Sequence, residues 1–468
     1  KPMPDFSVIS QAPEIRALVQ DGILERAFHD SLFPRLLFRG EATPVLWPAN
    51  IGDRQIFTGT GLLQKQQRAL VPGTDPTPQS FSAEQWEAVA QQYAGTVDTN
   101  MPTSMMAIAN LFYRNAQQLG LQAGQSLNGL VRNRLYNAAL SGQTVADGAQ
   151  GPTNTIRVKR LNGFTRARRP DLTTGSAVQY LPVSSSNPLP IKLFAGSEVS
   201  RNVIGFSADA AGDEVGPGTI TLDGAAVTVA DRDYVLSTAR TFLVRVGGGN
   251  KVDDVGSSDL FTLASIRAAV ARMRSMNVPE HQDGYFHCHM DPTSESQIFA
   301  DQEFQRLLTS MPDYYMYKQF GIGVLLGTIF IRNTEAPVPE TVVGGLTATF
   351  SQDDNFAGEL YNNGTTTGVR IHRPLFSAQG QIMEYHSDLS NLITEAGITG
   401  KVAEPRITNN GIDVFTERIQ LIIRAPLNRL QDQVSTSWKF IGDWPVRTDG
   451  ATGDAAYFKR SVAVEHGE

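Results

Sequence analysis

The feature that most constrains this chain is the segment 99–137, which has the apolar spacing of one long helix. Large apolar side chains recur in it at close to the helical period. They are Met105, Ile108, Phe112, Leu119, Leu127, Leu130 and Leu135. Thr103 or Ser104 can cap the helix at its start. At 1.5 Å per residue such a helix would span roughly 50 Å, against an average helix of about 11 residues.

Three glycines interrupt this pattern, at Gly120, Gly124 and Gly129. Each costs about 1 kcal/mol in a helix interior, whereas burial of the large apolar side chains contributes roughly 10 kcal/mol. Packing therefore outweighs the glycines, and we expect one helix with a bend near residues 120–124. The alternatives are an ordinary core helix and a pair of helices broken at Gly120.

The segments before this helix predict a helical arm and a two-stranded ribbon. Residues 12–38 carry a helical pattern, and residues 53–63 and 85–100 are rich in strand-forming residues. A polar tip, VPGTDPTPQS at 71–80, separates the two strand-rich stretches. An isolated ribbon is only marginally stable in water, so we expect a neighbouring subunit to hold it. The alternative is a local surface excursion of one domain.

Residues 153–256 have a different character, with short alternating strands between Gly and Asp turns. Several apolar residues alternate as a half-buried sheet requires. They are Ile220, Leu222, Val227, Val229, Phe242 and Val244. This block is predicted to be an inserted β-rich domain that folds locally.

The remainder of the chain mixes helices and strands. We expect helices at 262–276, 304–308 and near 387–396. Strands are predicted at 285–290, within 321–334, and at 344–350, 369–371, 418–424 and 461–464. With the preceding segments, this gives an α+β chain.

Composition excludes several classes of protein. The net charge of −7 argues against a surface that grips nucleic acid throughout, because such binding requires clustered Lys and Arg. The single cysteine, Cys288, excludes an intrachain disulfide and a multi-cysteine zinc site, which fits assembly in a reducing cytoplasm. No run of 18 apolar residues and no signal-peptide pattern is present, so we expect no membrane association.

Two local motifs suggest chemistry only weakly. His287 and His289 would share one face of a strand and could bind zinc, with Asp291 as a further ligand. A plain structural strand is the alternative, and we assign no metal and no other cofactor. The run 247–251, GGGNK, is similar to a phosphate-binding loop but continues with Val252 where that loop needs Ser or Thr. A turn is expected there.

The order of segments resembles the major capsid proteins of tailed bacteriophages, which have the Hong Kong 97 fold. The segments that carry the likeness are the long helix 102–140 entered from TVDTN at 96–100, YFHCHMDPTSESQIFADQEFQRLL at 285–308, GIGVLLGTIFIRNTEAPV at 321–338, and VRIHRPLFSAQGQIMEY at 369–385. The resemblance implies an N-terminal arm (1–52), an extended loop (53–100), a spine helix region (101–152), the inserted domain (153–256), a peripheral domain (257–338) and an axial domain with closing strands near 419–423 and 461–464 (339–468).

The resemblance further implies a non-enzymatic protein that self-assembles, as hexamers and pentamers, into an icosahedral shell around double-stranded DNA. The shell would form in the host bacterial cytoplasm, with portal, scaffold and decoration proteins as further partners and no sequence-specific DNA contact. An encapsulin-like nanocompartment with the same fold is one rival. A metal-dependent hydrolase that uses His287 and His289 is another.

Interface candidates follow from the same resemblance. Some relatives join a loop Lys to an Asn of a neighbour, and Lys65 is the only Lys of the proposed loop, but no matching motif surrounds it. We therefore expect noncovalent interlocking. The densest basic stretch can bind acidic side chains of a neighbouring subunit. It comprises Arg157, Lys159, Arg160, Arg166, Arg168 and Arg169. A solvated surface and contact with the packaged DNA are the alternatives.

Overall fold

The computed structural model places the chain in two compact units. It describes residues 27–28, 37–47, 52, 54–60, 69–76, 83–100, 111–168, 180–212, 214–238, 243–249, 251–275, 277–310, 323–333, 369, 371–387, 406–408, 411–416, 419–424, 433–446 and 460–468. The first unit comprises residues 1–55, 87–132 and 383–445, and the second comprises 56–86, 133–382 and 446–468.

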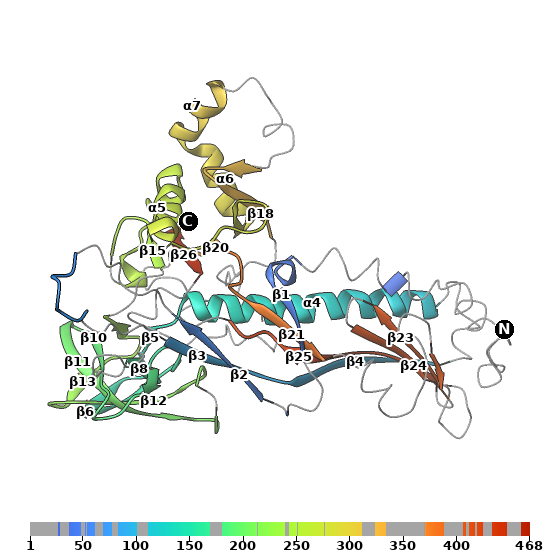
Figure 1. The fold of residues 1–468 in the computed structure, drawn as a ribbon, viewed down its shortest axis with the longest axis horizontal. Helices are drawn as coiled ribbons and strands as arrows, with labels where there is room; N and C mark the ends of the chain where they lie inside the picture. Colours follow the sequence, from blue (N-terminus) through green and yellow to red (C-terminus); the bar gives the residue numbers. More distant parts are fainter. Residues whose placement is uncertain are drawn as a thin grey trace. The chain divides into compact units, whose positions relative to one another are not determined.

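A mixed sheet of seven strands forms the first unit (Figure 1). Its order is β1 (Thr43–Trp47), β21 (Met383–Ser387), β25 (Gln433–Asp443), β24 (Ile419–Arg424), β23 (Gly411–Thr416) and β22 (Arg406–Thr408), with β4 (Gln91–Asn100) also paired to β25. Along β25 the residues alternate, so that Val434, Thr436, Trp438 and Phe440 are buried. This period of two gives the sheet one apolar face.

The long helix α4 (Leu111–Ala139) is continuous through all three glycines, so the alternative of two helices broken at Gly120 is wrong. Leu119, Leu127 and Leu135 are fully buried, as predicted, but Leu130 is only half-buried and Val131 takes its place in the buried stripe. Thr99 and Asn100 end strand β4 instead of beginning the helix. Residues 101–110, with the predicted cap and the first two stripe residues, lie outside the described part.

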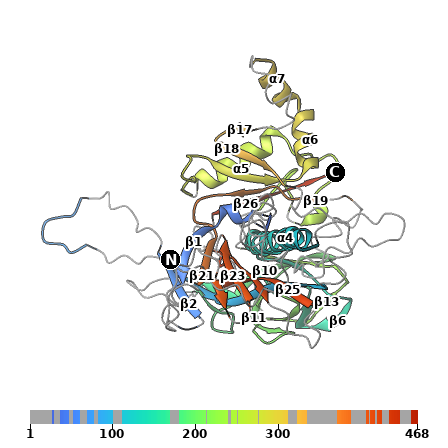
Figure 2. The ribbon, with the colours of Figure 1, turned by 90° about the vertical axis from the view of Figure 1, so that its right-hand side faces the viewer.

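The helix lies close against the sheet of the first unit: Figure 1 shows α4 running along β4 and β25, and Figure 2 shows it end-on beside β25. Gly95 of β4 allows this approach. A Cβ at this position would lie 2.7 Å from Gln122 Oε1 of the helix and 2.6 Å from Trp438 Nε1. Glycine is therefore required where the helix and the sheet meet.

The ribbon predicted before the helix is present, as β2 (Arg54–Thr60) paired with β3 (Ala83–Val89). The second predicted arm is divided at Ala90: β3 pairs within the ribbon, whereas β4 joins the sheet of the first unit. Of the predicted helical segment 12–38, residues 27–28 are described and helical, and residues 37–38 are described and form a turn.

A six-stranded antiparallel sheet in the second unit forms most of the predicted β-rich block. Its order is β5 (Gln143–Val145), β14 (Tyr234–Ser237), β10 (Leu189–Ala195), β11 (Ser197–Ala208), β12 (Gly218–Leu222) and β7 (Thr155–Val158). Two short strand pairs accompany it, β6 (Gln150–Thr153) with β13 (Val227–Val229) and β8 (Arg166–Arg168) with β9 (Tyr180–Pro182).

This sheet has its own apolar core, which includes Ile220, Leu222 and Val229 as predicted, with Val227 packed beside it. Two details of the prediction are wrong. The sheet begins at Gln143, ten residues before the predicted block, because β5 pairs with β14. Val244 packs on a different core and its strand belongs to another sheet. Phe242 is outside the described residues.

A second sheet of seven strands lies in the same unit (Figure 1). Its order is β15 (Leu243–Arg245), β26 (Ser461–Gly467), β20 (Leu375–Ser377), β16 (Phe286–Met290), β18 (Thr328–Arg332) and β17 (Val324–Leu325), with β19 (Ile371–His372) also paired to β26. Its helices are α5 (Leu263–Ser275), α6 (Pro292–Ala300) and α7 (Gln302–Ser310). Phe261, Ile266, Phe286 and Val462 are among the residues of its core.

This sheet corrects the predicted domain grouping. The segment 461–464 was expected beside 419–423, but β26 lies between β15 and β20 in the second unit, whereas β24 lies in the first. The segment 369–385 is likewise divided, because β19 and β20 pair with β26 while β21 pairs with β25. The predicted strand at 344–350 and helix near 387–396 fall almost entirely outside the described residues.

Candidate assembly and ligand sites

The β2–β3 ribbon exposes large apolar side chains. Ile56 is 65% exposed, and Leu70 and Val71 at the tip are 60% and 68% exposed. On the ribbon itself, the rings of Phe57 and Trp86 stack with their centroids 6.1 Å apart. Single exposed apolar residues are common, but a two-stranded ribbon has too little core of its own to be stable alone. The ribbon therefore presents an apolar surface suited to a partner.

The tip of the loop is an ordered turn. Thr74 N donates to Val71 O at 3.1 Å, with Pro72 second and Gly73 third in the turn, and Gly73 has a φ of +87°. Proline followed by a glycine with positive φ is the pattern of a type II turn. The proline and glycine of the predicted tip thus fix its shape. Lys65, the loop lysine, lies outside the described residues.

Most of the basic stretch is paired inside the second unit. Arg157 contacts Asp147 at 2.9 Å and Asp209 at 2.7 Å, and the hydrogen bonds that it donates, first to Asp147 and then to Asp209, raise its pKa. Arg166 pairs with Glu214 at 3.2 Å, and Lys159 Nζ lies 4.0 Å from Asp147. These carboxylates reduce the positive field that the sequence alone suggested.

Arg160 is different, because it is only 4% exposed and its guanidinium donates to Asn137 Oδ1 of α4. Burial of Arg160 within its own chain argues against the predicted contact with a neighbour. The side chain of Arg168 and the whole of Arg169 are outside the described part. For the exposed members, a role in subunit contact stays a prediction.

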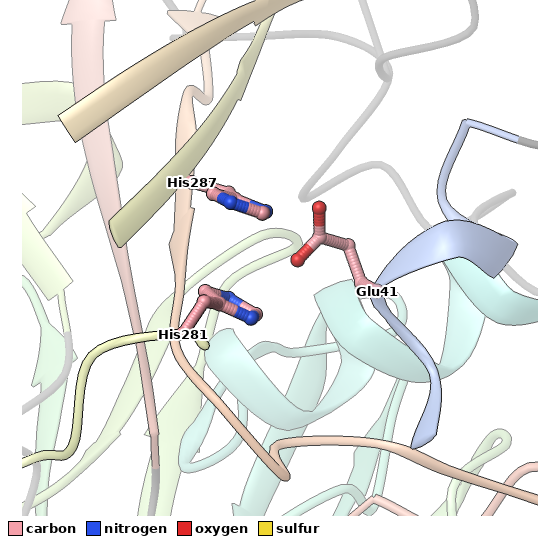
Figure 3. Close-up of side chains that lie close together, drawn as sticks. All are labelled: Glu41, His281 and His287. Carbon is pink, nitrogen blue, oxygen red and sulfur yellow. The ribbon is translucent and has the colours of Figure 1, made fainter. Parts of the chain in front are cut away.

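The histidines of β16 do not come together with Asp291 in the way that the zinc-site alternative would require. His289 is fully buried, while Asp291 caps helix α6 and pairs with His372 at 2.9 Å. His287 Nε2 lies 2.8 Å from Asp283 Oδ2, and its ring stacks on His281 at 4.0 Å with an interplanar angle of 8° (Figure 3). The nitrogen lone pairs of parallel rings do not converge on one ion. Glu41, drawn in the same view, belongs to the first unit, whereas both histidines belong to the second.

Two other motifs are structural. Cys288 is buried, and burial raises the pKa of its thiol, so the reactive thiolate is disfavoured. The glycines of the 247–251 run form a turn with positive φ at Gly247, Gly248 and Gly249. A Cβ at Gly247 would lie 2.6 Å from the Asp259 carboxylate. The glycines therefore allow the backbone of this turn to pass close to acidic side chains of the same chain.

A buried ionic network that sequence reasoning missed joins the two sheets of the second unit. Glu465 of β26 contacts Arg245 Nε at 2.7 Å and Arg373 Nε at 3.0 Å. Arg245 Nη2 also donates to Tyr234 and Gln143 of the six-stranded sheet, both at 2.9 Å. Burial lowers the pKa of Arg245, but Tyr234 and Glu465 outweigh it and raise the pKa overall. The polar residues of β26 therefore connect the two sheets.

A second buried cluster lies beside the first. It comprises Asp291, the N-cap of α6, with Ser294 of α6, His372 of β19 and His466 of β26, and the exposed Glu468 lies at its edge. Ser294 Oγ lies 2.7 Å from His466 Nε2, a contact like that between a nucleophile and its base. Both side chains are fully buried, so a substrate has no access to this serine. One sequence signal was present: Asp-Pro-Thr-Ser at 291–294 is a typical helix start, with Asp as N-cap and Pro at N1.

Among the helices of the described part of the chain, none is long and apolar enough to cross a membrane.

No protein-family model matches the sequence, and no curated protein matches it either. The solved structures that it resembles are bacteriophage capsids. The cyanophage Pam1 capsid has a TM-score of 0.48 at 11% identity, covering 94% of this chain and 92% of that one. The capsid of cyanophage P-SCSP1u has a TM-score of 0.46 at 10% identity, and the match covers 92% of this chain and 87% of that one. The capsid of Ralstonia phage GP4 has a TM-score of 0.45 at 11% identity, and the match covers 92% of this chain and 90% of that one.

Proposed function

We propose that this chain is a major capsid protein, the subunit that self-assembles into the icosahedral shell enclosing the double-stranded DNA of a tailed bacteriophage. The proposed fold is of the Hong Kong 97 type, with β2–β3 as the extended loop, α4 as the spine helix, and the six-stranded sheet as an inserted domain at 143–237. The peripheral domain would be built on the sheet around β16 and α5, and the axial domain on the sheet around β25.

One observation carries this proposal: a two-stranded ribbon that exposes Ile56, and Leu70 and Val71 at its tip, comes before the long helix in the sequence, and that helix is about 43 Å long. A ribbon of this kind becomes stable when a neighbouring copy covers it. Head-to-tail contacts of identical subunits close into rings when the rotation per subunit closes. Hexamers and pentamers of the chain are the proposed rings, and portal, scaffold and decoration proteins are proposed as further partners.

The geometry gives a rival enzyme little support. Asp291 is engaged by His372 and by the start of α6, Cys288 is buried, and the imidazoles of His281 and His287 stack in parallel. We therefore propose a structural role without catalysis. Virion capsid is the proposed location, and assembly in the bacterial cytoplasm belongs to the same proposal.

Assembly of the purified full chain tests the proposal, with light scattering and negative-stain electron microscopy as readouts. Wild-type protein should form closed shells. Ile56→Asp places a charge on the exposed apolar face of the ribbon and should leave a folded subunit that forms no shells. Leu260→Asp is the matched control, because Leu260 is also exposed, at 39%, but lies outside the ribbon.

Two outcomes would count against the proposal. Monomeric wild-type protein under all assembly conditions would contradict self-assembly. Normal shells from Ile56→Asp would show that the ribbon does not hold neighbours together. A 260/280 absorbance ratio well above that of protein in shells from infected cells would support a genome container, whereas a protein-like ratio would favour the nanocompartment.

A further inference from the structure

The second buried cluster contains two histidines in different electrostatic settings. His372 lies between two carboxylates, with Nδ1 2.9 Å from Asp291 and Nε2 3.2 Å from Glu468. His466 instead faces Ser294 Oγ at 2.7 Å and the carbonyl of Gly467 at 3.2 Å. The two rings stack with centroids 5.3 Å apart. The carboxylates favour a charged His372, and that charge opposes a second one on His466.

Counting protons shows that the cluster is not fully satisfied while His466 is neutral. Three contacts follow one another: Gly467 O with His466 Nδ1, His466 Nε2 with Ser294 Oγ, and Ser294 Oγ with Asp291 Oδ1. Each contact needs one proton. A neutral imidazole and a hydroxyl supply two, and the ionised Asp291 supplies none. A second proton on His466 would complete the series but would place two cations side by side.

No other charged group balances His466 among the described residues packed on it. Phe261 stacks on its ring at 5.2 Å. Helix α5 packs on β26 with apolar residues and Ser265, while its arginines are not among its buried residues. Glu465, the preceding residue of β26, is engaged by Arg245 and Arg373. Only His372, Asp291 and Glu468 therefore set the charge near His466.

We propose that His372 and His466 form a pH-sensitive latch that holds β26 against α6 and β19. With one charged ring the strand is held in place, and protonation of the second ring in acid releases it.

The direction of the pH dependence follows from each group. Burial, and then the charge of His372, lowers the pKa of His466 to about 3 in the folded chain, against 6.5 in a released strand. Acid therefore favours the released state as pH falls from about 6.5 toward 3. Burial lowers the pKa of His372, but Asp291 and Glu468 outweigh it and raise the pKa, so its contribution is lost as pH rises above 6.5. The latch should hold best near pH 6.5.

Hydrogen exchange measured by mass spectrometry on the full chain tests the latch, with rates corrected for intrinsic exchange. Protection of a peptide covering 461–467 should fall roughly 15-fold between pH 6.5 and pH 5, because His466 of the released strand is half protonated at pH 6.5 and almost fully protonated at pH 5. A peptide covering β10 serves as the internal control, since no histidine lies in that strand, and it should keep its protection.

Variants assign the effect to a residue. His466→Gln removes the titrating ring, so the pH dependence in the 461–467 peptide should disappear. His287→Gln, a partly exposed histidine of β16, should retain it. Wild-type protection that does not change between pH 6.5 and pH 5 would overturn the proposal, whether or not the variant folds. So would an imidazole of His466 that titrates near pH 6.5 in a spectrum of histidine-labelled wild-type protein.

Discussion

The two sheets of the second unit are built in opposite ways. All six strands of the antiparallel sheet come from residues 143–237, and its core consists of apolar residues such as Ile191, Leu193 and Ile220. The seven-stranded sheet draws its strands from residues 243–245, 286–290, 324–332, 371–377 and 461–467, and it places Glu465 and His466 inside. Local segments can find one another by apolar packing alone. We infer that distant segments need polar groups to specify which strand goes where.

The largest expected difference between the sheets is the ability to fold in isolation. A fragment of residues 143–237 should give a well-dispersed amide spectrum, because it contains every strand of its sheet and its own core. A fragment of residues 243–377 should remain unfolded, because it lacks β26, the partner of β15 and β20. Similar spectra from both fragments would remove the distinction.

Glu465→Leu should cause the largest loss among single substitutions in the second unit. It leaves Arg245 and Arg373 buried without their carboxylate, and breaking a buried pair in this way costs about 3–5 kcal/mol. Urea unfolding followed by tryptophan fluorescence measures the free energy. A loss below about 1 kcal/mol would mean that the arginines are satisfied without Glu465.

Ile191→Ala tests the apolar sheet in the same way. Ile191 is fully buried in β10, and removal of a large aliphatic side chain from a core costs about 2–5 kcal/mol. Hydrogen exchange should show a loss of protection in peptides of the six-stranded sheet first. A peptide that covers β26 should keep its protection. Equal loosening of both sheets would show that they unfold as one cooperative body.

Glu198→Gln is the substitution with the smallest expected change in the free energy of unfolding. Glu198 pairs with Lys192 at 2.6 Å, but both side chains are about a third or more exposed. Solvent-exposed pairs contribute about 0–1 kcal/mol, so the unfolding free energy should hardly change. A loss comparable to that of Glu465→Leu would contradict the view that burial distinguishes the two ion pairs.

This comparison explains which features were predictable from the sequence. Helix α5, strand β16 and the alternation of Ile220, Leu222 and Val229 depend on local periodicity, which a sequence displays directly. The pairing of β26 with β15 and β20 depends on contacts across 220 residues for Arg245 and Glu465 and 92 residues for Arg373 and Glu465, and no local pattern records it. The predicted strand covers 461–464, whereas β26 continues to Gly467 and buries the polar residues Glu465 and His466 fully.

The candidate sites show the same limit. Clustering in the sequence suggested one basic surface at 157–169, but Arg157 and Arg166 meet carboxylates from distant turns, and Arg160 turns inward. Likewise, Asp291, which was considered as a zinc ligand beside His287 and His289, caps a helix and faces His372. Residue types predict which chemistry a chain can perform, whereas the tertiary fold decides which groups meet.

The position of β26 has a consequence for biosynthesis. Its neighbours β15 and β20 leave the ribosome first, and about 80 further residues follow β20 before β26 emerges, which takes roughly 4–16 s at bacterial rates. During that interval β20 has an open edge and β15 has no partner in its sheet. Unpaired edges are where chains aggregate. A nascent chain therefore needs protection at this sheet until translation has supplied the missing strand.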